Sequence, residues 1–344
     1  MVKNIPRIRK KFKQGYTYLN RNMIMDCHPD HIYHDLLSTF RVEDLHQYPD
    51  MFLPYKLLSE YLNVSENNLL LTRGVEGSIK TVFESLNLGG ECVGVFVPTC
   101  AMFKVYADVF DVNFIPIKGR PPEYNITVEQ VKEIIPKIKV LFLTNPMSHL
   151  ENCFSNEQLE DLIYFCEKHN VIVFLDEVYT GWENKSYLPF LNKHNNLIIS
   201  SSFSKIGFPS IKTGWLACNK KLKTQLEATR GAYELDYFSN KTLEFIINNR
   251  DYFKELKRNL LRTKKRWIEY FSANSNFTVY NSSLYTVRLY SEDKKIIKHI
   301  FDSLYSKKIV VNVLDKTNLQ FSVSTNQEIE KLIFNEIKVN TNKQ

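Results

Sequence analysis

The most informative segment of the chain reads Ser201-Ser202-Phe203-Ser204-Lys205-Ile206-Gly207-Phe208-Pro209-Ser210-Ile211-Lys212-Thr213-Gly214-Trp215. It follows the apolar run Leu197-Ile198-Ile199, so Lys205 is expected just beyond the end of a strand. A lysine that reacts with a carbonyl group must be desolvated enough to be a free amine part of the time. The neighbouring hydroxyls and the second cation, Lys212, suit a phosphate. Most lysines beside serines are solvated surface residues, so this segment alone only raises the hypothesis that Lys205 holds pyridoxal phosphate (PLP) as a Schiff base.

Short apolar runs alternate with helical patterns before this segment. We expect strands at 69–72, 92–97, 112–117, 139–144, 171–175 and 196–201. We expect helices at 54–63, 75–86, 101–110, 128–135 and 156–169. This alternation predicts an α/β fold in which a mostly parallel sheet is flanked by helices. Ligands of such sheets bind outside the carboxyl ends of the strands, and polar residues gather at those ends here.

The pattern changes after residue 219. Helices are expected at 219–232, 239–272, 293–305 and 326–337, with strands at 276–280, 284–290, 308–313 and 319–324. These elements predict a smaller α+β domain at the C-terminus. Residues 1–50 show little periodicity beyond one short helix at 31–39. The predicted organisation is an N-terminal arm at 1–40, a large PLP-binding domain at 41–235 and a small domain at 236–344.

Composition narrows the class of protein. The 344 residues are 44% hydrophobic and 24% charged, as in ordinary soluble globular proteins. Part of the net charge of +7 is concentrated in the first fourteen residues, which we interpret as a solvated arm because no nucleic-acid-binding pattern follows. No apolar run reaches the ~18 residues of a membrane span. The six cysteines lack C-x-x-C spacing. We therefore expect a cytoplasmic protein without nucleic-acid or membrane partners.

PLP requires three kinds of protein group, and each has candidates at a strand end. The turn Gly74-Val75-Glu76 opens a helix and can bind the phosphate through backbone N–H groups, with Ser202 and Lys212 as further donors. Asp176 follows the apolar run 171–175 and can pair with the ring nitrogen. Tyr179 and Asn145 can donate hydrogen bonds to the ring oxygen. Each of these residues alone has an ordinary structural explanation, such as a helix cap or a core aromatic.

Taken together and in this order, the motifs resemble those of the fold-type-I PLP-dependent aminotransferases, and most closely the histidinol-phosphate aminotransferase subgroup. The resemblance runs from about Leu19 to the C-terminus. It is carried by Leu19-Asn20-Arg21-Asn22, Gln47-Tyr48-Pro49-Asp50, Thr72-Arg73-Gly74-Val75-Glu76, Pro98-Thr99-Cys100-Ala101-Met102-Phe103, Thr144-Asn145-Pro146, Asp176-Glu177-Val178-Tyr179 and Ser202-Phe203-Ser204-Lys205.

The resemblance implies a role for each matching position. Lys205 would bind PLP covalently and shuttle a proton, with Asp176 and Tyr179 as the other catalytic residues. Tyr48 would reach the phosphate of the cofactor in a neighbouring subunit, which implies a homodimer with shared active sites. Asn20 and Arg21 would face the substrate.

Four positions depart from the family pattern. Lys212 replaces a phosphate-binding arginine and lies one residue closer to Lys205 than usual. Cys100 replaces an aromatic residue whose ring stacks on the cofactor, and we expect the ring of Phe103 to compensate for this loss. Gln320 and Asn312 occupy the positions of two substrate-binding arginines. Losing one charge-assisted hydrogen bond costs about 1.5–3 kcal/mol. Either the substrate lacks an α-carboxylate at that place, or another cation substitutes. The available cations are Arg21, Arg73, Arg288 and Lys316.

The predicted function is transfer of an amino group between a small amine or amino acid, phosphorylated or otherwise non-standard, and a keto acceptor. A PLP-dependent decarboxylase of a phosphorylated amino acid is the alternative on the same scaffold. A non-catalytic PLP-binding regulatory module ranks lower, because the arm is too short for a DNA-binding module. We expect no metal site: the cluster Cys27-His28-Pro29-Asp30-His31-Ile32-Tyr33-His34 has no second ligand pair elsewhere.

Overall fold

The computed structural model describes residues 12–26, 28–147, 154–182, 185–274 and 276–341. Its large domain is built on a seven-stranded sheet with the order β2-β8-β7-β6-β5-β3-β4. The strands are β2 (Leu69–Thr72), β3 (Cys92–Val97), β4 (Asn113–Lys118), β5 (Val140–Thr144), β6 (Ile172–Asp176), β7 (Leu197–Ser202) and β8 (Gly214–Cys218). Only β8 runs antiparallel to its neighbours in this sheet. The predicted mostly parallel α/β sheet is therefore confirmed.

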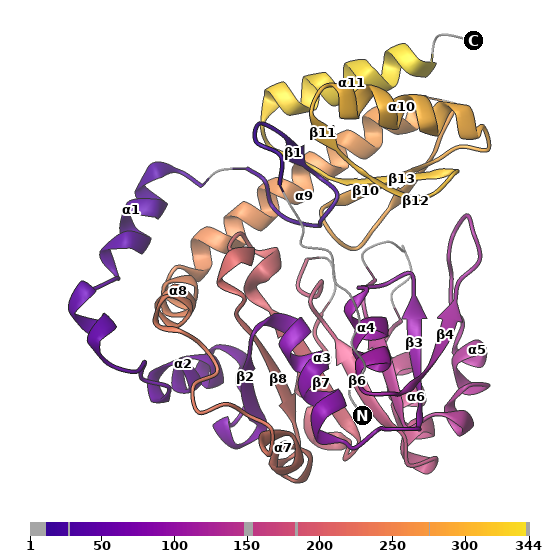
Figure 1. Ribbon diagram of the computed structural model, residues 1–344. Coiled ribbons are helices and arrows are strands. Elements are labelled where there is room, and N and C mark those ends of the chain that lie inside the picture. Colours follow the sequence, from indigo (N-terminus) through magenta and orange to yellow (C-terminus); the bar gives the residue numbers. More distant parts are fainter. Residues whose placement is uncertain (1–11, 27, 148–153, 183–184, 275, 342–344) are drawn as a thin grey trace.

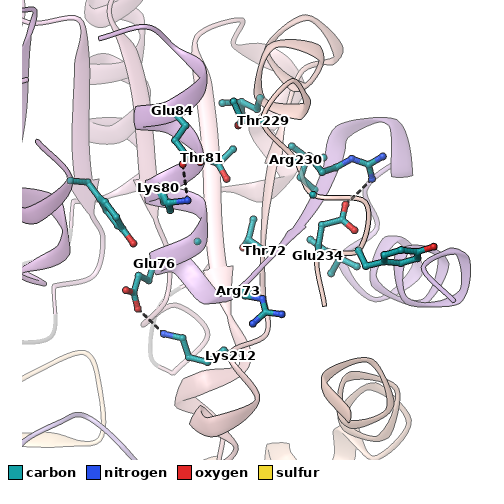
Figure 2. Close-up of a pocket in the computed structure, with 17 residues that line it drawn as sticks. Thr72, Arg73, Glu76, Lys80, Thr81, Glu84, Lys212, Thr229, Arg230 and Glu234 are labelled. Atoms are coloured by element: carbon teal, nitrogen blue, oxygen red, sulfur yellow. Dashed lines mark hydrogen bonds and ion pairs between the residues drawn. The ribbon is translucent and has the colours of Figure 1, made fainter. Parts of the chain in front are cut away.

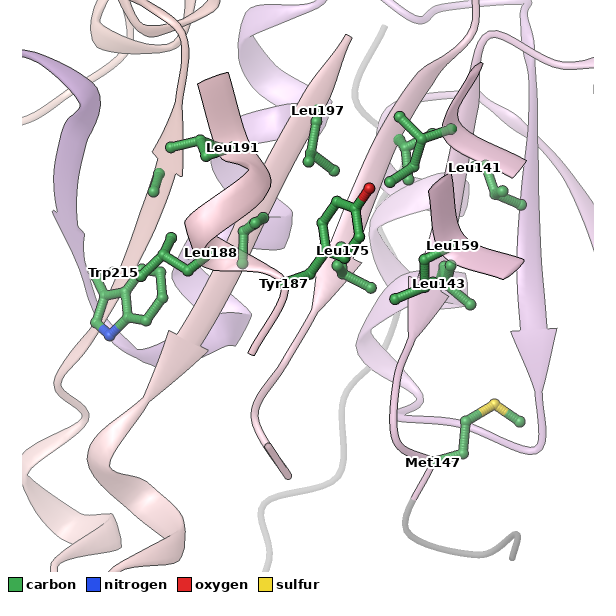
Figure 3. Close-up of a cluster of buried hydrophobic side chains, with 14 of the residues drawn as sticks. Leu141, Leu143, Met147, Leu159, Leu175, Tyr187, Leu188, Leu191, Leu197 and Trp215 are labelled. Carbon is green, nitrogen blue, oxygen red and sulfur yellow. The ribbon is translucent and has the colours of Figure 1, made fainter. Parts of the chain in front are cut away.

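Helices cover both faces of this sheet (Figure 1). One face packs against α3 (Gly74–Ser85), α4 (Met102–Val109) and α7 (Lys220–Glu227). The other packs against α2 (Phe52–Leu62), α5 (Val128–Lys132), α6 (Asn156–Lys168) and α8 (Tyr237–Asn248). Successive strand residues face opposite sides, as the period of two requires: Leu141 and Leu143 point to the second face, while Phe142 points to the first. Figure 3 shows the core on the second face.

The small domain holds a four-stranded antiparallel sheet with the order β12-β13-β10-β9. Its strands are β9 (Thr278–Asn281), β10 (Thr286–Tyr290), β12 (Asn312–Asp315) and β13 (Asn318–Ser322). Helices α10 (Lys294–Ser306) and α11 (Gln327–Thr341) pack on it, and α9 (Arg250–Ser272) joins the two domains. Phe253 of α9 lies in the large-domain core, whereas Trp267 lies in the small-domain core. In Figure 1 this domain lies above the large sheet.

The N-terminal segment spans both domains. Strand β1 (Thr17–Tyr18) pairs in parallel with β11 (Ile309–Val310) of the small domain. The chain then passes along the cavity described below and enters α1 (Asp30–Ser38), beside the large domain. The domain limits given above stay a prediction. In the part of the chain that the structure describes, no helix is long and apolar enough to cross a membrane.

Several predicted elements differ from the observed ones. The helix expected at 239–272 is two helices, because Asn249 leaves the helical conformation at φ −105° and ψ 27°. No element was predicted at 214–218, which forms the fully buried strand β8. The helix expected at 128–135 ends at Lys132, since Pro136 cannot continue it and lies instead in the short 3-10 helix Ile135–Lys137.

Candidate active site

A cavity of about 550 Å³ lies between the carboxyl ends of the large sheet, the N-terminal segment and the small domain. The sheet side of its wall includes Gly74, Val75, Glu76, Cys100, Thr144, Asp176, Tyr179, Ser202, Lys205 and Lys212. The opposite side includes Asn20, Arg21, Asn22 and Asn312. Most of the site residues proposed from the sequence thus line one cavity, although they come from segments far apart along the chain.

Lys205 ends the short 3-10 helix Phe203–Lys205 that follows β7. Its Nζ lies 3.5 Å from the backbone oxygen of Arg21 and 5.7 Å from the centre of the Tyr179 ring. Burial lowers the pKa of Lys205 to about 8, and the nearby Asp176 opposes this shift. A useful fraction of this amine is therefore neutral near neutral pH, as a nucleophilic lysine requires.

Asp176 is the last residue of β6 and is 5% exposed. Its Oδ1 accepts a hydrogen bond from the Val178 backbone N–H at 2.9 Å, and its Oδ2 accepts one from Thr144 Oγ1 at 3.4 Å. Burial raises the pKa of Asp176 to about 7, while these two donors and Lys205 pull it down. A cationic group placed beside this carboxylate would stabilise its charged form.

Tyr179 is held from the side of the small domain. Its hydroxyl accepts a hydrogen bond from Asn22 Nδ2 at 3.1 Å, and the backbone oxygen of Asn22 accepts one from the Tyr285 hydroxyl at 2.8 Å. Our site prediction omitted Asn22 and Thr144. Both were contained in motifs that carry the resemblance, so position within a motif was the signal that could have identified them.

Helix α3 provides the anion-binding end of the cavity. Gly74 is its first residue and has φ +68°, which favours glycine. A Cβ on Gly214 would lie 2.6 Å from the Gly74 Cα, so β8 and this turn approach too closely for a side chain. The Ser202 hydroxyl lies nearby in the cavity wall, and Lys212 Nζ forms an ion pair with Glu76 at 2.7 Å. These groups can bind a phosphate at the helix N-terminus.

Three predicted cofactor residues lie elsewhere. Phe103 is 1% exposed and packs on Phe142 in the core, so the expectation that its ring compensates for Cys100 is wrong. Asn145 uses its side chain to hold the backbone of Phe154, as donor at 3.2 Å and acceptor at 2.8 Å, and it does not line the cavity. Tyr48 is 77% exposed and lies outside the cavity.

The two positions where arginines were expected have different surroundings. Asn312 lines the cavity. Gln320 does not: it is 1% exposed inside the small-domain sheet and donates a hydrogen bond to Thr286 Oγ1 at 3.3 Å. Its placement as a substrate residue is therefore corrected, because its amide is used within the sheet.

Only one of the four available cations lines the cavity. Arg288 is buried, donates to Asn318 Oδ1 at 2.8 Å and stacks 3.8 Å from the Tyr280 ring centre. Lys316 is exposed near the turn between β12 and β13. Arg21 is in the cavity wall, and its guanidinium lies 4.2 Å from the centre of the Phe12 ring.

Arg73 lines a second cavity of about 440 Å³ beside the first. Figure 2 shows this cavity with three ion pairs on its wall: Lys212–Glu76, Lys80–Glu84 and Arg230–Glu234. Tyr233 also lines it and stacks on Tyr48, with ring centres 4.7 Å apart.

Residues 30–34 of the Cys/His-rich segment, from which no metal site was expected, belong to α1. Among the described residues no group of three or more His, Cys, Asp or Glu side chains could hold a metal ion. Cys27 lies outside the described residues. His28 is buried and bound to aromatic neighbours.

The donor set fits PLP. A partly neutral buried lysine can bind its aldehyde, a buried carboxyl whose pKa is about 7 suits a protonated ring nitrogen, and the start of α3 suits its phosphate. In addition, Asn20 Oδ1 is buried and accepts no hydrogen bond from the part of the chain that is described, so a ligand donor can satisfy it. The fold and this cavity define the class of fold-type-I PLP-dependent enzymes.

Known proteins agree with this class. Residues 30–334 match the family model described as aminotransferase class I and II. A histidinol-phosphate aminotransferase from Rippkaea orientalis is 24% identical over 323 residues, covering 92% of this chain and 90% of that protein.

Two solved structures share the fold. A histidinol-phosphate aminotransferase from Sinorhizobium meliloti in complex with PLP has a TM-score of 0.81 and 16% identity, covering 94% of this chain and 90% of that one. An L-threonine-O-3-phosphate decarboxylase from Porphyromonas gingivalis has a TM-score of 0.74 and 15% identity, covering 94% and 98%. The chain belongs to the aminotransferase class I and II family. It is an enzyme, a PLP-dependent aminotransferase.

Proposed function

We propose that this enzyme moves an amino group between a small phosphorylated amine and a keto acid. The observation that carries the proposal is that Lys205 and Asp176 line one cavity with Arg21 opposite them. The bound cofactor supplies an electron sink for the substrate carbon that bears the nitrogen. Lys205 Nζ would take the proton from that carbon and deliver it to the former aldehyde carbon of the cofactor, C4′, and Asp176 would hold the proton on the ring nitrogen.

The cations of the cavity support a substrate with one anionic group. Among the described residues of its wall, the cations are Arg21, Lys205 and Lys212. Lys205 is needed for the chemistry, and Lys212 lies at the start of α3, where we place the cofactor phosphate. Arg21 remains for the substrate, and it can bind a phosphate through two parallel hydrogen bonds. Relatives named histidinol-phosphate aminotransferase support a phosphorylated amine.

The test is a screen of amines with the purified protein. Each amine is added to the PLP-loaded enzyme, and the loss of its visible absorbance is followed as the amino group is taken up. Amines that carry one phosphate and no carboxylate should react at the lowest concentrations. Preferential reaction with plain dicarboxylic amino acids would refute the assignment of Arg21 as a single anion site.

Decarboxylation remains the second candidate, and the solved decarboxylase of the same fold favours it. The two reactions differ in which bond of the substrate carbon lies perpendicular to the ring. A phosphorylated amino acid with its carboxylate present should distinguish them, because release of CO₂ reports decarboxylation and formation of a keto acid reports transamination.

We also propose a homodimer in which Tyr48 contributes to the partner's site. Exposed apolar side chains gather in the segment that holds Tyr48: Val42, Leu45, Phe52 and Leu53. Exposed apolar side chains that gather in one region are typical of an interaction surface.

The described cysteines Cys92, Cys100, Cys166 and Cys218 are free thiols, which supports the predicted cytoplasmic location.

Mixing two inactive variants tests the shared site. In a mixed dimer of Lys205→Ala and Tyr48→Ala chains, one site receives both changes and the other receives neither. Activity should therefore exceed that of either variant alone after the subunits are exchanged. Activity equal to the average of the two parents would contradict a shared site.

A further inference from the structure

His28 lies directly beside the loop that carries Lys205, and the chemistry assigned above does not use it. Its side chain is 6% exposed, between β1 and α1. The imidazole stacks on Phe208 with ring centres 4.7 Å apart. The Cε1 and Nε2 edge of the imidazole lies against the backbone of Gly207. His28 thus contacts Gly207 and Phe208, the second and third residues after Lys205.

The loop is shaped to receive this ring. Gly207 has φ +134°, a conformation that residues with a side chain rarely adopt. A Cβ at this position would lie 2.6 Å from Cε1 and Nε2 of His28. The glycine is therefore required both by the backbone and by the close approach of the histidine. The same loop is the one that reaches Lys212 one residue earlier than the family pattern does.

The other side of the imidazole contacts the helix that joins the domains. Nδ1 of His28 lies 2.7 Å from the Tyr252 hydroxyl, in the first turns of α9. Since Nδ1 lies at hydrogen-bond distance from the Tyr252 hydroxyl, the consistent arrangement is a neutral ring that accepts at Nδ1 and carries its own proton on Nε2, the nitrogen that faces Gly207. Burial lowers the pKa of His28, which favours this neutral form. The ring therefore bridges the Lys205 loop and α9.

We infer that His28 is a positioning residue for Lys205, holding the loop after it against α9 so that the amine stays desolvated in the cavity. The inference rests on the proposed role of Lys205. A second contact from the same segment supports it, because the backbone oxygen of Arg21 lies 3.5 Å from Lys205 Nζ. The N-terminal segment thus fixes both the amine and the loop behind it.

The experiment measures the amine directly. The full-length chain is freed of PLP and mixed with PLP at a series of pH values, and the rate at which the visible absorbance appears is recorded. Only the neutral amine reacts, so the rate should rise through the pKa of Lys205, about 8 in the wild type. In His28→Phe a ring is kept, but both ring nitrogens and the hydrogen bond to Tyr252 are lost. Water then reaches the amine, and the midpoint should move upward by about half a pH unit or more.

His194→Phe is the matched control. His194 is also 6% exposed, and its Nε2 lies 3.0 Å from the Tyr187 hydroxyl. It precedes β7, whereas Lys205 follows that strand. We expect this variant to lower the melting temperature as much as His28→Phe does but to leave the midpoint unchanged. His28→Gln keeps a polar side chain that can form a hydrogen bond with the Tyr252 hydroxyl and should recover most of the wild-type midpoint.

The remaining outcomes separate the possible failures. Tyr252→Phe removes one hydroxyl, should fold, and should shift the midpoint upward by less than His28→Phe. If His28→Phe does not fold, Tyr252→Phe decides the matter. Midpoints equal to the wild-type value in all folded variants would overturn the positioning role while leaving the aminotransferase assignment intact. Failure of the wild type to take up PLP would overturn both.

Discussion

The cavity has two walls that differ in the charged side chains they present. The large sheet forms one wall, and the N-terminal segment and the small domain form the other. On the sheet side, Lys205 and Asp176 are buried, and their pKa values are moved toward neutrality to about 8 and about 7. On the other side, the arginines expected at 312 and 320 are absent, and Arg21 is the cation of the wall. The reaction is thus assigned to the sheet and the choice of substrate to the segments above it. Changes on the two sides should therefore have different kinetic signatures.

The largest effect is expected from Lys205→Ala. The variant loses both the covalent link to PLP and the group that moves the proton, so kcat should fall by about 10⁴-fold. It should still bind PLP, with the absorbance spectrum of the free aldehyde instead of the wild-type spectrum. In the wild type, the rate of PLP uptake should increase as the pH rises through about 8, because the neutral amine becomes more abundant. A spectrum unchanged by the substitution would contradict the assignment of Lys205.

Asp176→Asn should have the next largest effect. The amide keeps the shape of the side chain but cannot carry the charge that holds a proton on the ring nitrogen. We expect kcat to fall by about 10²- to 10⁴-fold with a small change in KM. Because the pKa of Asp176 is about 7 before the cofactor binds, PLP affinity of the wild type should weaken as the pH falls below it, and the variant should lose this dependence. Affinity that falls equally in both would argue against the pairing.

The sequence predicted the sheet side of this comparison better than the other side. Lys205 and Asp176 lie at strand ends, where the order of elements alone fixes their neighbourhood. Asn145 also follows a strand, but its amide is used by the backbone of Phe154, a contact that no local pattern encodes. Phe103 fails for a similar reason, since the direction of a residue on α4 depends on how the helix packs. The strand β8 was missed because its residues directly continue a loop rich in turn formers.

Arg21→Gln tests the opposite wall and should act mainly on KM. Loss of a bidentate, charge-assisted contact of about 1.5–3 kcal/mol raises KM for a phosphorylated amine by about 10- to 100-fold, with kcat changed little. The control is an amine without an anionic group, which both forms should use equally poorly. The purified protein also has to show the wild-type PLP spectrum, since Lys205 Nζ lies close to the Arg21 backbone. An equal loss for both amines would mean that Arg21 supports the site and does not recognise the anion.

Cys100→Tyr should have the smallest effect of these substitutions. It tests whether the space beside Cys100, where the two walls of the cavity meet, is occupied by the cofactor or by the substrate. Cys100 lines the cavity where a ring stacks on the cofactor in the family pattern, and Phe103 cannot replace that ring because it lies in the core. An added ring should stabilise bound PLP by about 0.5–1.5 kcal/mol, or roughly 2- to 10-fold in affinity. Cys100→Ser, which adds no ring, serves as the control and should bind PLP as the wild type does. Tighter binding of PLP together with a raised KM would mean that the space beside Cys100 belongs to the substrate. Tighter binding alone would mean that the cysteine leaves that space empty.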